Sequence, residues 1–318
     1  MAAELSLSIV TPSFNTATYL GPAIESVLAQ DWPGLRYIVM DGGSTDGSID
    51  VLRSYDNRIQ WVSQKDGGQS DALNKGFAKL GGDVLGWLNS DDTYAPGAFR
   101  AVMEFMAANP DVALVYGNAN FIDARGKLIG PCVHIEPYNQ RRLFHYTDFI
   151  VQPAAFFRRD AFEAVGGIDA ALHWAMDYDL WLKIAKRFKV AYVPRLLANF
   201  RWLRGNKTAT GGFGRLDEIE RILAQHGMGL PAYNRLERVN LHVEAAKRSL
   251  GEGAFGKAIG SLAAATGNTL RSPRAMLSLL QPLTWKIIWT GQVLRKRAVA
   301  RVEAPSRVLE SLEERRFL

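Results

Sequence analysis

The sequence of 318 residues has a single cysteine, Cys132, so no disulfide bond can form within the chain. A reducing compartment is the simplest setting for such a chain. The N-terminal stretch MAAELSLSIVTPS lacks both a basic region and a long apolar run, so we expect no signal peptide. No low-complexity tract interrupts a composition that is 47% hydrophobic and 22% charged. The sequence therefore predicts a folded, cytoplasmic globular protein.

Acidic residues are missing from one long stretch. Residues 253–302 contain no Asp or Glu but eight Lys and Arg, which exceeds the net charge of +6 of the whole chain. The rest of the chain is therefore close to neutral. This uneven distribution argues against nucleic-acid binding by the protein as a whole.

The basic stretch also contains an apolar segment, residues 275–294, of about the length that crosses a bilayer. Lys286 near its centre makes insertion costly. Basic residues flank the segment at Arg271, Arg274 and residues 295–297. We therefore expect a helix lying in an anionic membrane surface, which would place the protein peripherally on the inner face of the cell membrane. The alternative is a helical appendage packed on the main domain or on a second subunit of a homo-oligomer.

Strand-like and helical segments alternate along the first half of the chain. This alternation predicts a parallel sheet covered by helices. The predicted strands are residues 5–11, 35–41, 58–63 and 83–89, and the predicted helices are residues 17–30, 44–55 and 69–80. Further helices are predicted at 96–110, 159–167 and 177–187, and further strands at 113–123, 153–159, 189–194 and 196–203. From about residue 215 only helices are expected, with a helical hairpin over residues 245–265.

Polar clusters follow each of the first four predicted strands. In a parallel α/β sheet these carboxyl ends meet at one edge, where ligands bind. Each cluster alone is ordinary turn chemistry, but four at one edge favour a binding site. The clusters are Thr11-Pro12-Ser13, Asp41-Gly42-Gly43, Lys65-Asp66-Gly67-Gly68 and Asn89-Ser90-Asp91-Asp92.

The chemistry of this edge favours a divalent cation. Neither a Gly-x-Gly-x-x-Gly motif after the first strand nor a Gly-Lys-Ser/Thr motif is present, so the usual phosphate cradles are absent. Two adjacent carboxylates, Asp91 and Asp92, suit Mg²⁺ or Mn²⁺, which can carry a diphosphate among its other ligands. One of the two could instead cap a helix N-terminus.

Six motifs occur in order between residues 5 and 210: SIVTPSFN, IVMDGGSTDGS, DGGQSDALNKG, GWLNSDD, VQPAAFFRR and AMDYDLWLK. Together they resemble the inverting, GT-A-fold glycosyltransferases of family 2. The resemblance implies a Rossmann-like nucleotide-diphospho-sugar transferase domain at residues 1–212, followed by a helical, basic and amphipathic region at residues 213–318. Residues 1–95 would bind the nucleotide-sugar, and residues 96–212 would hold the acceptor and the base.

The resemblance implies a nucleotide-sugar donor, most often a UDP-sugar, bound across the first four strands. It assigns the base and ribose contacts to Thr11, Pro12, Ser13, Asp41, Asp66 and Asp71. Asn89, Ser90, Asp91 and Asp92 resemble the family's Asp-x-Asp region, which contacts the ribose and the metal. Asn89 replaces the usual first Asp, so the implied metal ligands are Asp91 and Asp92. Leu73 stands where many members have an arginine, and Lys65 or Lys75 would supply that charge.

In the second half, AMDYDLW implies that Asp177 is the general base that deprotonates the acceptor hydroxyl. Asp179 lies two residues further along the helix, points elsewhere, and is expected to be structural. Gln152 and Pro153 resemble a motif near the acceptor pocket, although the start of an interior strand explains them nearly as well.

Three further groups are candidates for contacts in this half. Trp87 and Trp174 could stack on sugar rings, and a core position is an equal alternative for Trp87. The stretch FRWLRGNKTAT resembles a loop that closes on the donor diphosphate. Leu203 stands where many relatives have a metal-binding His. The candidate phosphate contacts in this loop are Arg201, Arg204 and Lys207.

The expected function is metal-dependent, inverting sugar transfer to a hydroxyl of a glycan or lipid-linked acceptor, as in synthesis of surface polysaccharide or glycolipid. One alternative is a sugar-phosphate nucleotidyltransferase, but TPSFNTATYL lacks the Gly-rich, basic loop that such an enzyme needs. A second alternative is a non-catalytic nucleotide-sugar-binding protein. Retention of Asp91, Asp92 and Asp177 argues against that alternative.

Overall fold

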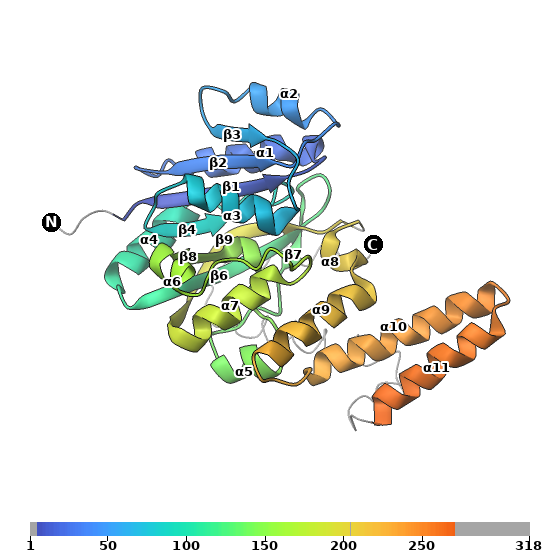
Figure 1. Ribbon diagram of the computed structural model, residues 1–318. Helices are drawn as coiled ribbons and strands as arrows, with labels where there is room; N and C mark the ends of the chain where they lie inside the picture. Colours follow the sequence, from blue (N-terminus) through green and yellow to red (C-terminus); the bar gives the residue numbers. More distant parts are fainter. Residues whose placement is uncertain (1–4, 204, 271–318) are drawn as a thin grey trace, which may run out of the picture.

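The computed structural model describes residues 5–203 and 205–270. A nine-stranded mixed sheet runs through it in the order β3-β2-β1-β4-β8-β6-β9-β5, with β7 paired to β6 (Figure 1). The strands are β1 (Leu7–Ser13), β2 (Arg36–Asp41), β3 (Gln60–Ser63), β4 (Val84–Trp87), β5 (Thr93–Tyr94), β6 (Val112–Ile122), β7 (Leu128–Pro131), β8 (Ala155–Arg158) and β9 (Lys189–Arg201).

Helices cover both faces of this sheet, with α3, α6 and α7 on one face and α1 and α4 on the other (Figure 1). Their bounds are α1 (Ala17–Leu28), α2 (Ser48–Arg53), α3 (Gln69–Lys79), α4 (Ala98–Ala108), α5 (Gln140–His145), α6 (Arg159–Ala164), α7 (Met176–Arg187) and α8 (Lys207–Thr210). A 3₁₀ turn, η1, spans Gln152–Ala154. The last helices are α9 (Gly212–Gln225), α10 (Ala232–Gly251) and α11 (Phe255–Leu270).

The predicted parallel sheet is confirmed for β1 to β4. β1 pairs in parallel with β2 and β4, and β2 pairs in parallel with β3. Beyond β4, where no strand direction was predicted, β8 runs antiparallel to both β4 and β6. Short apolar strands look alike in either direction, so the sequence pattern does not encode this reversal. The halves 1–95 and 96–212 therefore share one sheet.

Two strands predicted at residues 189–194 and 196–203 form one continuous strand, β9. Its register against β6 shifts where Val193 faces Gly117 and Leu196 faces Asn118. Pro194, which has no N–H for the ladder, lies at this irregularity, as prolines within sheets commonly do. The proline therefore marks a bulge in the strand and not its end.

Strand β8 supplies aromatic side chains to both faces of the sheet. Phe156 packs on Tyr94 and Phe99, whereas Phe157 packs on Phe77, Phe162, Trp87 and Trp181. Trp87 is 1% exposed and stacks on Trp181 with ring centroids 5.8 Å apart. A ring without an open face cannot stack on a sugar, so the acceptor role predicted for Trp87 is wrong and its core alternative holds.

Arg158 and Arg159, at the end of β8, close the C-terminal ends of two helices. Arg158 donates to the carbonyls of Met106, Asn109 and Val112 after α4. Arg159 donates to the carbonyls at residues 77, 80 and 82 after α3. Terminal helix carbonyls have no partner within the helix, and a hydrogen bond to a charged group contributes about 1.5–3 kcal/mol. One dipeptide thus fixes a helix on each side of the sheet.

The helical hairpin predicted near the C-terminus is confirmed as α10 and α11, which lie side by side and extend away from the sheet (Figure 1). The predicted apolar segment at 275–294 and its flanking basic residues lie outside the described residues. Among residues 5–203 and 205–270, no helix is both long and apolar enough to cross a bilayer.

Candidate active site

Asp41, predicted to bind the base edge, is used to build the turn after β2. The residue is 2% exposed. Oδ2 accepts hydrogen bonds from the N–H of Gly43 and Ser44 and from the Ser63 hydroxyl, at 2.7–3.0 Å. Oδ1 accepts a hydrogen bond from the Ser44 hydroxyl at 2.5 Å. These bonds occupy the carboxylate, so a ligand-binding role for this side chain is not supported.

The end of β1 presents Phe14 and not the residues before it. Thr11, Pro12 and Ser13 are buried, and the Thr11 hydroxyl lies 3.0 Å from that of Tyr37. Their side chains therefore do not line an open pocket as predicted. Phe14, the next residue, is 62% exposed and takes the surface position that was predicted for those three residues.

Phe14, Gly42 and Asp66 converge from the ends of three strands. A Cβ built on Gly42 would lie 3.3 Å from the Phe14 ring and 3.1 Å from Asp66 Oδ2, so a larger residue would require these side chains to shift. Asp66 Oδ1 accepts the N–H of Gly68 at 2.8 Å. The group forms an aromatic and acidic corner at the carboxyl edge of the sheet.

Asp71 and Lys75 form an ion pair on α3. Lys75 Nζ lies 2.6 Å from Asp71 Oδ2, which also accepts the N–H of Gly67 at 2.9 Å. The lysine and then the Gly67 amide hold the pKa of Asp71 below its ordinary value. Lys65 is exposed beside this corner.

Asp91 and Asp92, after β4, occupy different environments. Asp92 is 1% exposed, and Oδ1 accepts the backbone N–H of Arg201 at 2.8 Å. Burial and then the charge of Asp91 raise the pKa of Asp92 well above its ordinary value. Asp91 is partly exposed, and burial raises its pKa also, while the charge of Arg201 opposes that rise. Asp91 is therefore the carboxylate that a ligand can reach.

Arg201 is buried in the structure, contrary to its predicted contact with the donor diphosphate. Its guanidinium donates to the backbone oxygens of Asp91 and Asp123 at 2.7 and 2.8 Å, and it lies over the ring of Tyr19. The residue is 3% exposed. Arg201 therefore fixes the Asp91-Asp92 turn from β9, and its burial leaves little of the guanidinium for a phosphate to reach. Arg204, predicted beside it, lies outside the described residues.

Lys207 joins the two halves of the site through a chain of side chains. Lys207 Nζ donates to Gln69 Oε1 at 3.1 Å, and Gln69 Nε2 donates to Asn89 Oδ1 at 2.8 Å. Asn89 Nδ2 in turn approaches Asp92 Oδ2 at 3.4 Å. Ser90 accepts a hydrogen bond from the Thr16 hydroxyl at 2.9 Å. Asn89 thus belongs to a polar network in which the amide takes both a donor and an acceptor role.

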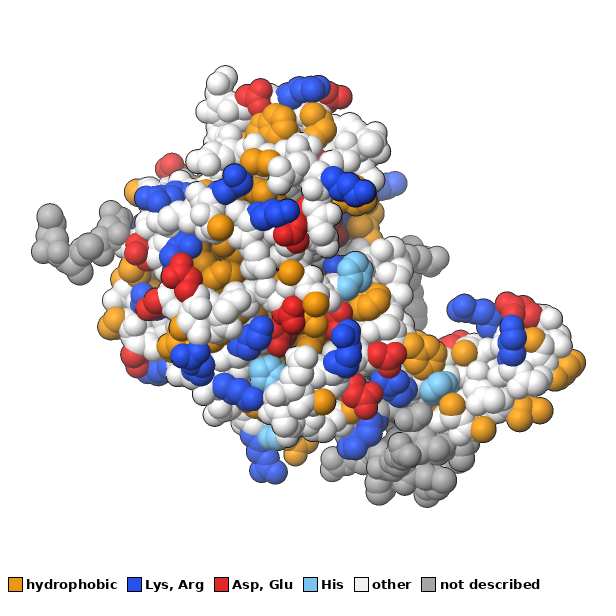
Figure 2. All heavy atoms as spheres, in the orientation of Figure 1, with side chains coloured by type: hydrophobic (Ala, Val, Ile, Leu, Met, Phe, Trp, Pro, Cys, Tyr) orange, Lys and Arg blue, Asp and Glu red, His pale blue; other side chains and the backbone are white. Residues whose placement is uncertain are grey.

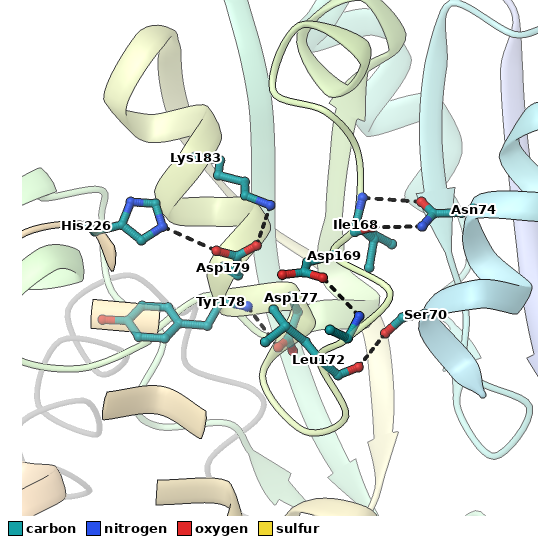
Figure 3. Close-up of polar contacts among 11 residues, drawn as sticks. Ser70, Asn74, Ile168, Asp169, Leu172, Asp177, Tyr178, Asp179, Lys183 and His226 are labelled. Carbon is teal, nitrogen blue, oxygen red and sulfur yellow. Dashed lines mark hydrogen bonds and ion pairs between the residues drawn. The ribbon is translucent and has the colours of Figure 1, made fainter. Parts of the chain in front are cut away.

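Asp177 lies at the start of α7 with its side chain partly buried. Burial raises its pKa, and the positive charges of Lys207 and Arg215 act in the opposite direction. Oδ1 accepts the N–H of Tyr178 at 2.8 Å (Figure 3). A second carboxylate, Asp148, lies near enough for the two charges to interact, and burial followed by the charge of Asp177 raises the pKa of Asp148 well above its ordinary value. A carboxylate with a raised pKa is a stronger proton acceptor.

Asp179 points away from Asp177 toward the other side of α7, as its spacing predicts (Figure 3). Its carboxylate is paired with Lys183 Nζ at 2.6 Å and lies 3.2 Å from His226 Nε2. Burial alone would raise the pKa of Asp179, but these two partners hold it below the ordinary value. Asp179 therefore links α7 to the end of α9.

The remaining predicted acceptor residues lie in two settings. Gln152 is 8% exposed, and its Nε2 donates to the backbone oxygen of Trp87 at 2.8 Å. Pro153 is buried beside it in η1. Trp174 is partly exposed immediately before α7. Of the candidates, Trp174 alone offers a ring surface to a bound sugar.

Four residues of this region are absent from the sequence-based predictions: Phe14, Gln69, Asp148 and Glu218. Phe14 carried a usable signal, since an aromatic residue follows directly on a polar strand end. Gln69 lies within a quoted motif, but nothing in the motif separates it from a helix start. Asp148 and Glu218 carried no signal in the sequence. Only the folded chain brings Asp148 near Asp177, and only the folded chain brings Glu218 to the backbone of residues 173–175.

No group of three or more His, Cys, Asp or Glu side chains within the described ranges could hold a metal ion by itself. The donor set present is nevertheless suited to a hard cation. Two neighbouring carboxyl groups have raised pKa values because they are buried next to each other, and one of them, Asp91, is accessible. A divalent cation at Asp91 would relieve this repulsion.

The parallel half-sheet with acidic strand ends, extended by a second half of mixed strand direction, is that of a GT-A-fold glycosyltransferase. TarS from S. aureus in complex with UDP-GlcNAc matches with a TM-score of 0.58 and 13% identity, covering 84% of this chain and 92% of that one. The mannosyltransferase PcManGT from Pyrobaculum calidifontis, in complex with GDP-Man and Mn²⁺, matches with a TM-score of 0.57 and 19% identity, covering 92% and 86%. At these identities the likeness shows the fold alone.

The model of glycosyl transferase family 2 matches residues 8–166, so the chain belongs to that family. An uncharacterised glycosyltransferase of Rickettsia felis is 29% identical over 212 residues, which are 62% of this chain and 34% of the relative. Chondroitin synthase of Escherichia coli is 28% identical over 206 residues, which are 64% of this chain and 30% of the synthase. The chain thus matches about a third of the length of these two relatives.

The charge of Asp177 predicts a shift in the pKa of Asp148. A like charge raises a carboxyl pKa, so Asp177→Asn, which removes that charge, should lower the pKa of Asp148. NMR titration of the Asp148 carboxyl carbon measures this pKa. Asp169→Asn is the matched control, since Asp169 caps its own loop through the N–H of Ala171. An unchanged pKa of Asp148 in Asp177→Asn would contradict the interaction.

Proposed function

We propose that this chain transfers a sugar, with inversion, from a nucleotide-sugar to a hydroxyl of a glycan or lipid-linked acceptor, with help from a divalent cation. The position of Lys207 carries the proposal. Its ammonium group donates to Gln69 on the donor side and interacts electrostatically with Asp177 on the acceptor side. Through Gln69 and Asn89, Lys207 is thereby linked to the strand end that carries the accessible carboxylate of Asp91, while its charge acts on the proton acceptor Asp177, as transfer between two substrates needs.

A UDP-sugar is the donor that the corner at Phe14 supports best. The exposed ring offers a stacking surface for a base, and the Asp66 carboxylate can accept hydrogen bonds from its edge. TarS is described with UDP-GlcNAc, whereas PcManGT is described with GDP-Man. Among the described residues, Lys207 is the remaining candidate for a diphosphate contact, because Arg201 is committed to the Asp91-Asp92 turn.

Asp91 would hold the cation, with the donor diphosphate and water as its other ligands. A bound divalent cation would offset the charge that develops on the leaving diphosphate. PcManGT is described with Mn²⁺. Asp92 would hold the turn that carries Asp91, since Asp92 Oδ1 accepts the backbone N–H of Arg201 in β9.

In the reaction, Asp177 takes the proton from the acceptor hydroxyl as that oxygen forms its bond to the anomeric carbon. The bond from this carbon to the diphosphate oxygen breaks on the opposite face, which inverts the configuration. Partial burial strengthens Asp177 as a base, and Lys207 and Arg215 keep a fraction of it ionised. Trp174, immediately before α7, would provide a surface for the acceptor sugar.

The proposed activity is tested by nucleotide release from UDP-GlcNAc, UDP-Glc, UDP-Gal and GDP-Man, with Mn²⁺ or Mg²⁺ and with water or simple sugars as acceptor. Asp177→Asn should lower turnover by at least about 100-fold, because the base is lost, while donor binding measured by calorimetry stays unchanged. Asp160→Asn, which alters an exposed carboxylate at the start of α6, is the control. Equal turnover of Asp177→Asn and wild type would remove Asp177 from the mechanism.

The proposed metal site makes a separate prediction. Asp91→Asn should raise the Mn²⁺ concentration that gives half-maximal turnover by at least about tenfold, because the accessible ligand loses its charge. Asp71→Asn, which alters a carboxylate paired with Lys75, should leave that concentration unchanged. Turnover that is insensitive to chelation in wild type would count against a metal altogether.

We further propose that the C-terminal region brings the enzyme to an anionic membrane surface, where lipid-linked acceptors are found. The hairpin of α10 and α11 exposes apolar side chains, among them Phe255 at 66% and Ile259 at 68% (Figure 2). Lys257, which lies between these two residues in the sequence, is also exposed. In the sequence, the basic and apolar residues 271–301 follow directly after α11.

Deletion of residues 271–318 should therefore abolish sedimentation with vesicles that contain phosphatidylglycerol, because both the basic charge and the apolar segment are removed. The full chain should bind these vesicles and bind them more weakly as salt is added. Neutral phosphatidylcholine vesicles serve as the control. Continued sedimentation of the truncated chain would place the membrane contact elsewhere.

A further inference from the structure

The loop that leads into α7 is held at both ends by helices from other parts of the chain. At its start, Asn74 of α3 exchanges two hydrogen bonds with the backbone of Ile168, at 2.7 and 3.2 Å. Ser70 of α3 donates to the backbone oxygen of Leu172 at 2.8 Å (Figure 3). The donor-side helix thus anchors the first part of a loop that ends two residues before Asp177.

At the other end, one carboxylate from α9 receives three consecutive backbone N–H groups. Glu218 Oε2 accepts from His173 at 2.8 Å, and Oε1 accepts from Trp174 and Ala175 at 2.6 and 2.8 Å. These amides lie at the N-terminal end of α7, where helix carbonyls do not reach them. Glu218 is 1% exposed, so its charge is satisfied by these bonds and not by water.

The same face of α9 also receives the side chain of Trp174. A Cβ built on Gly211 would lie 2.9 Å from the indole, and one built on Gly214 would lie 2.8 Å from it. Gly214 and Glu218 are four residues apart in α9, so they lie along one side of the helix, and Gly211 lies directly before its first residue. Backbone and side chain of Trp174 are therefore both fixed by this one side.

We propose that α9 is a positioning element of the active site, in which Glu218, Gly211 and Gly214 place Trp174 and, through the start of α7, Asp177. The inference rests on the proposed sugar transfer for its effect on rate. Glu218 is a positioning residue, because it acts through the residues that meet the acceptor. Helix α9 lies beyond residues 8–166, which the family model matches.

Hydrogen exchange tests the attachment without any need for activity. In Glu218→Gln a single amide oxygen replaces two carboxylate oxygens, and it cannot accept three N–H groups. Exchange of the amides at residues 173–175 should become at least about tenfold faster in this variant. Glu220→Gln, on the exposed side of the same helix, should leave their exchange unchanged. Equal exchange in Glu218→Gln and wild type would overturn the inference.

Kinetics then test positioning, using the nucleotide-sugar that wild type turns over fastest. Glu218→Gln and Gly214→Ala should each lower kcat by about 10- to 100-fold, because small displacements of reacting groups are costly, while the donor KM stays unchanged. Alanine favours a helix over glycine, so a loss of kcat in Gly214→Ala without a lower Tm separates positioning from folding. Gly260→Ala is its matched control, since no described atom lies within 4 Å of that position.

Two kinetic results would overturn the inference. One is a kcat within twofold of wild type in both Glu218→Gln and Gly214→Ala. The other is a rise in donor KM that matches the loss of kcat, which would indicate general disruption. A wild-type protein without turnover would instead overturn the proposed sugar transfer, and the exchange result would still decide whether Glu218 holds the loop.

Discussion

Two neighbouring carboxylates at the end of a buried strand repel each other, and the structure is arranged to keep them there. Arg201 meets this demand from β9: its backbone N–H bonds Asp92, and its guanidinium bonds the backbone oxygen of Asp91. The same guanidinium reaches the backbone oxygen of Asp123 after β6. The ends of β4, β6 and β9 are therefore joined at one buried arginine. Because that arginine is used inside the protein, Asp91 remains the accessible carboxylate.

Local pattern predicted the first half of the fold well, since β1 to β4 and their helices alternate with clear periodicity and end in recognisable turns. The pattern carried no strand direction, so the reversal at β8 was missed. Two strands were predicted where β9 is continuous, because Pro194 resembles a strand end. The two-residue strand β5 and the exposed strand β7 are too short or too polar in context to stand out.

The sequence predicted some residues of the site and not others. Asp177, Asp91 and Lys207 lie at the edge that the motifs indicated, although their roles rest on the proposed function. Trp87 and Arg201 failed as ligand contacts because sequence cannot tell a buried aromatic or arginine from an exposed one. Glu218 was invisible for another reason. Its carboxylate accepts hydrogen bonds from the backbone N–H groups of residues 173–175, which are distant from it in the sequence.

The place of β8 between β4 and β6 has a consequence for the order of events during synthesis. β4 is an edge strand until residues 155–158 have been made, and an open edge exposes unpaired backbone groups. The part formed by β1 to β4 therefore cannot complete its sheet as it leaves the ribosome, and the turn at Asp91 must wait still longer, for Arg201. Chains released early would have an unpaired strand edge and an unsupported acidic turn. Such chains are recognised by chaperones and proteases.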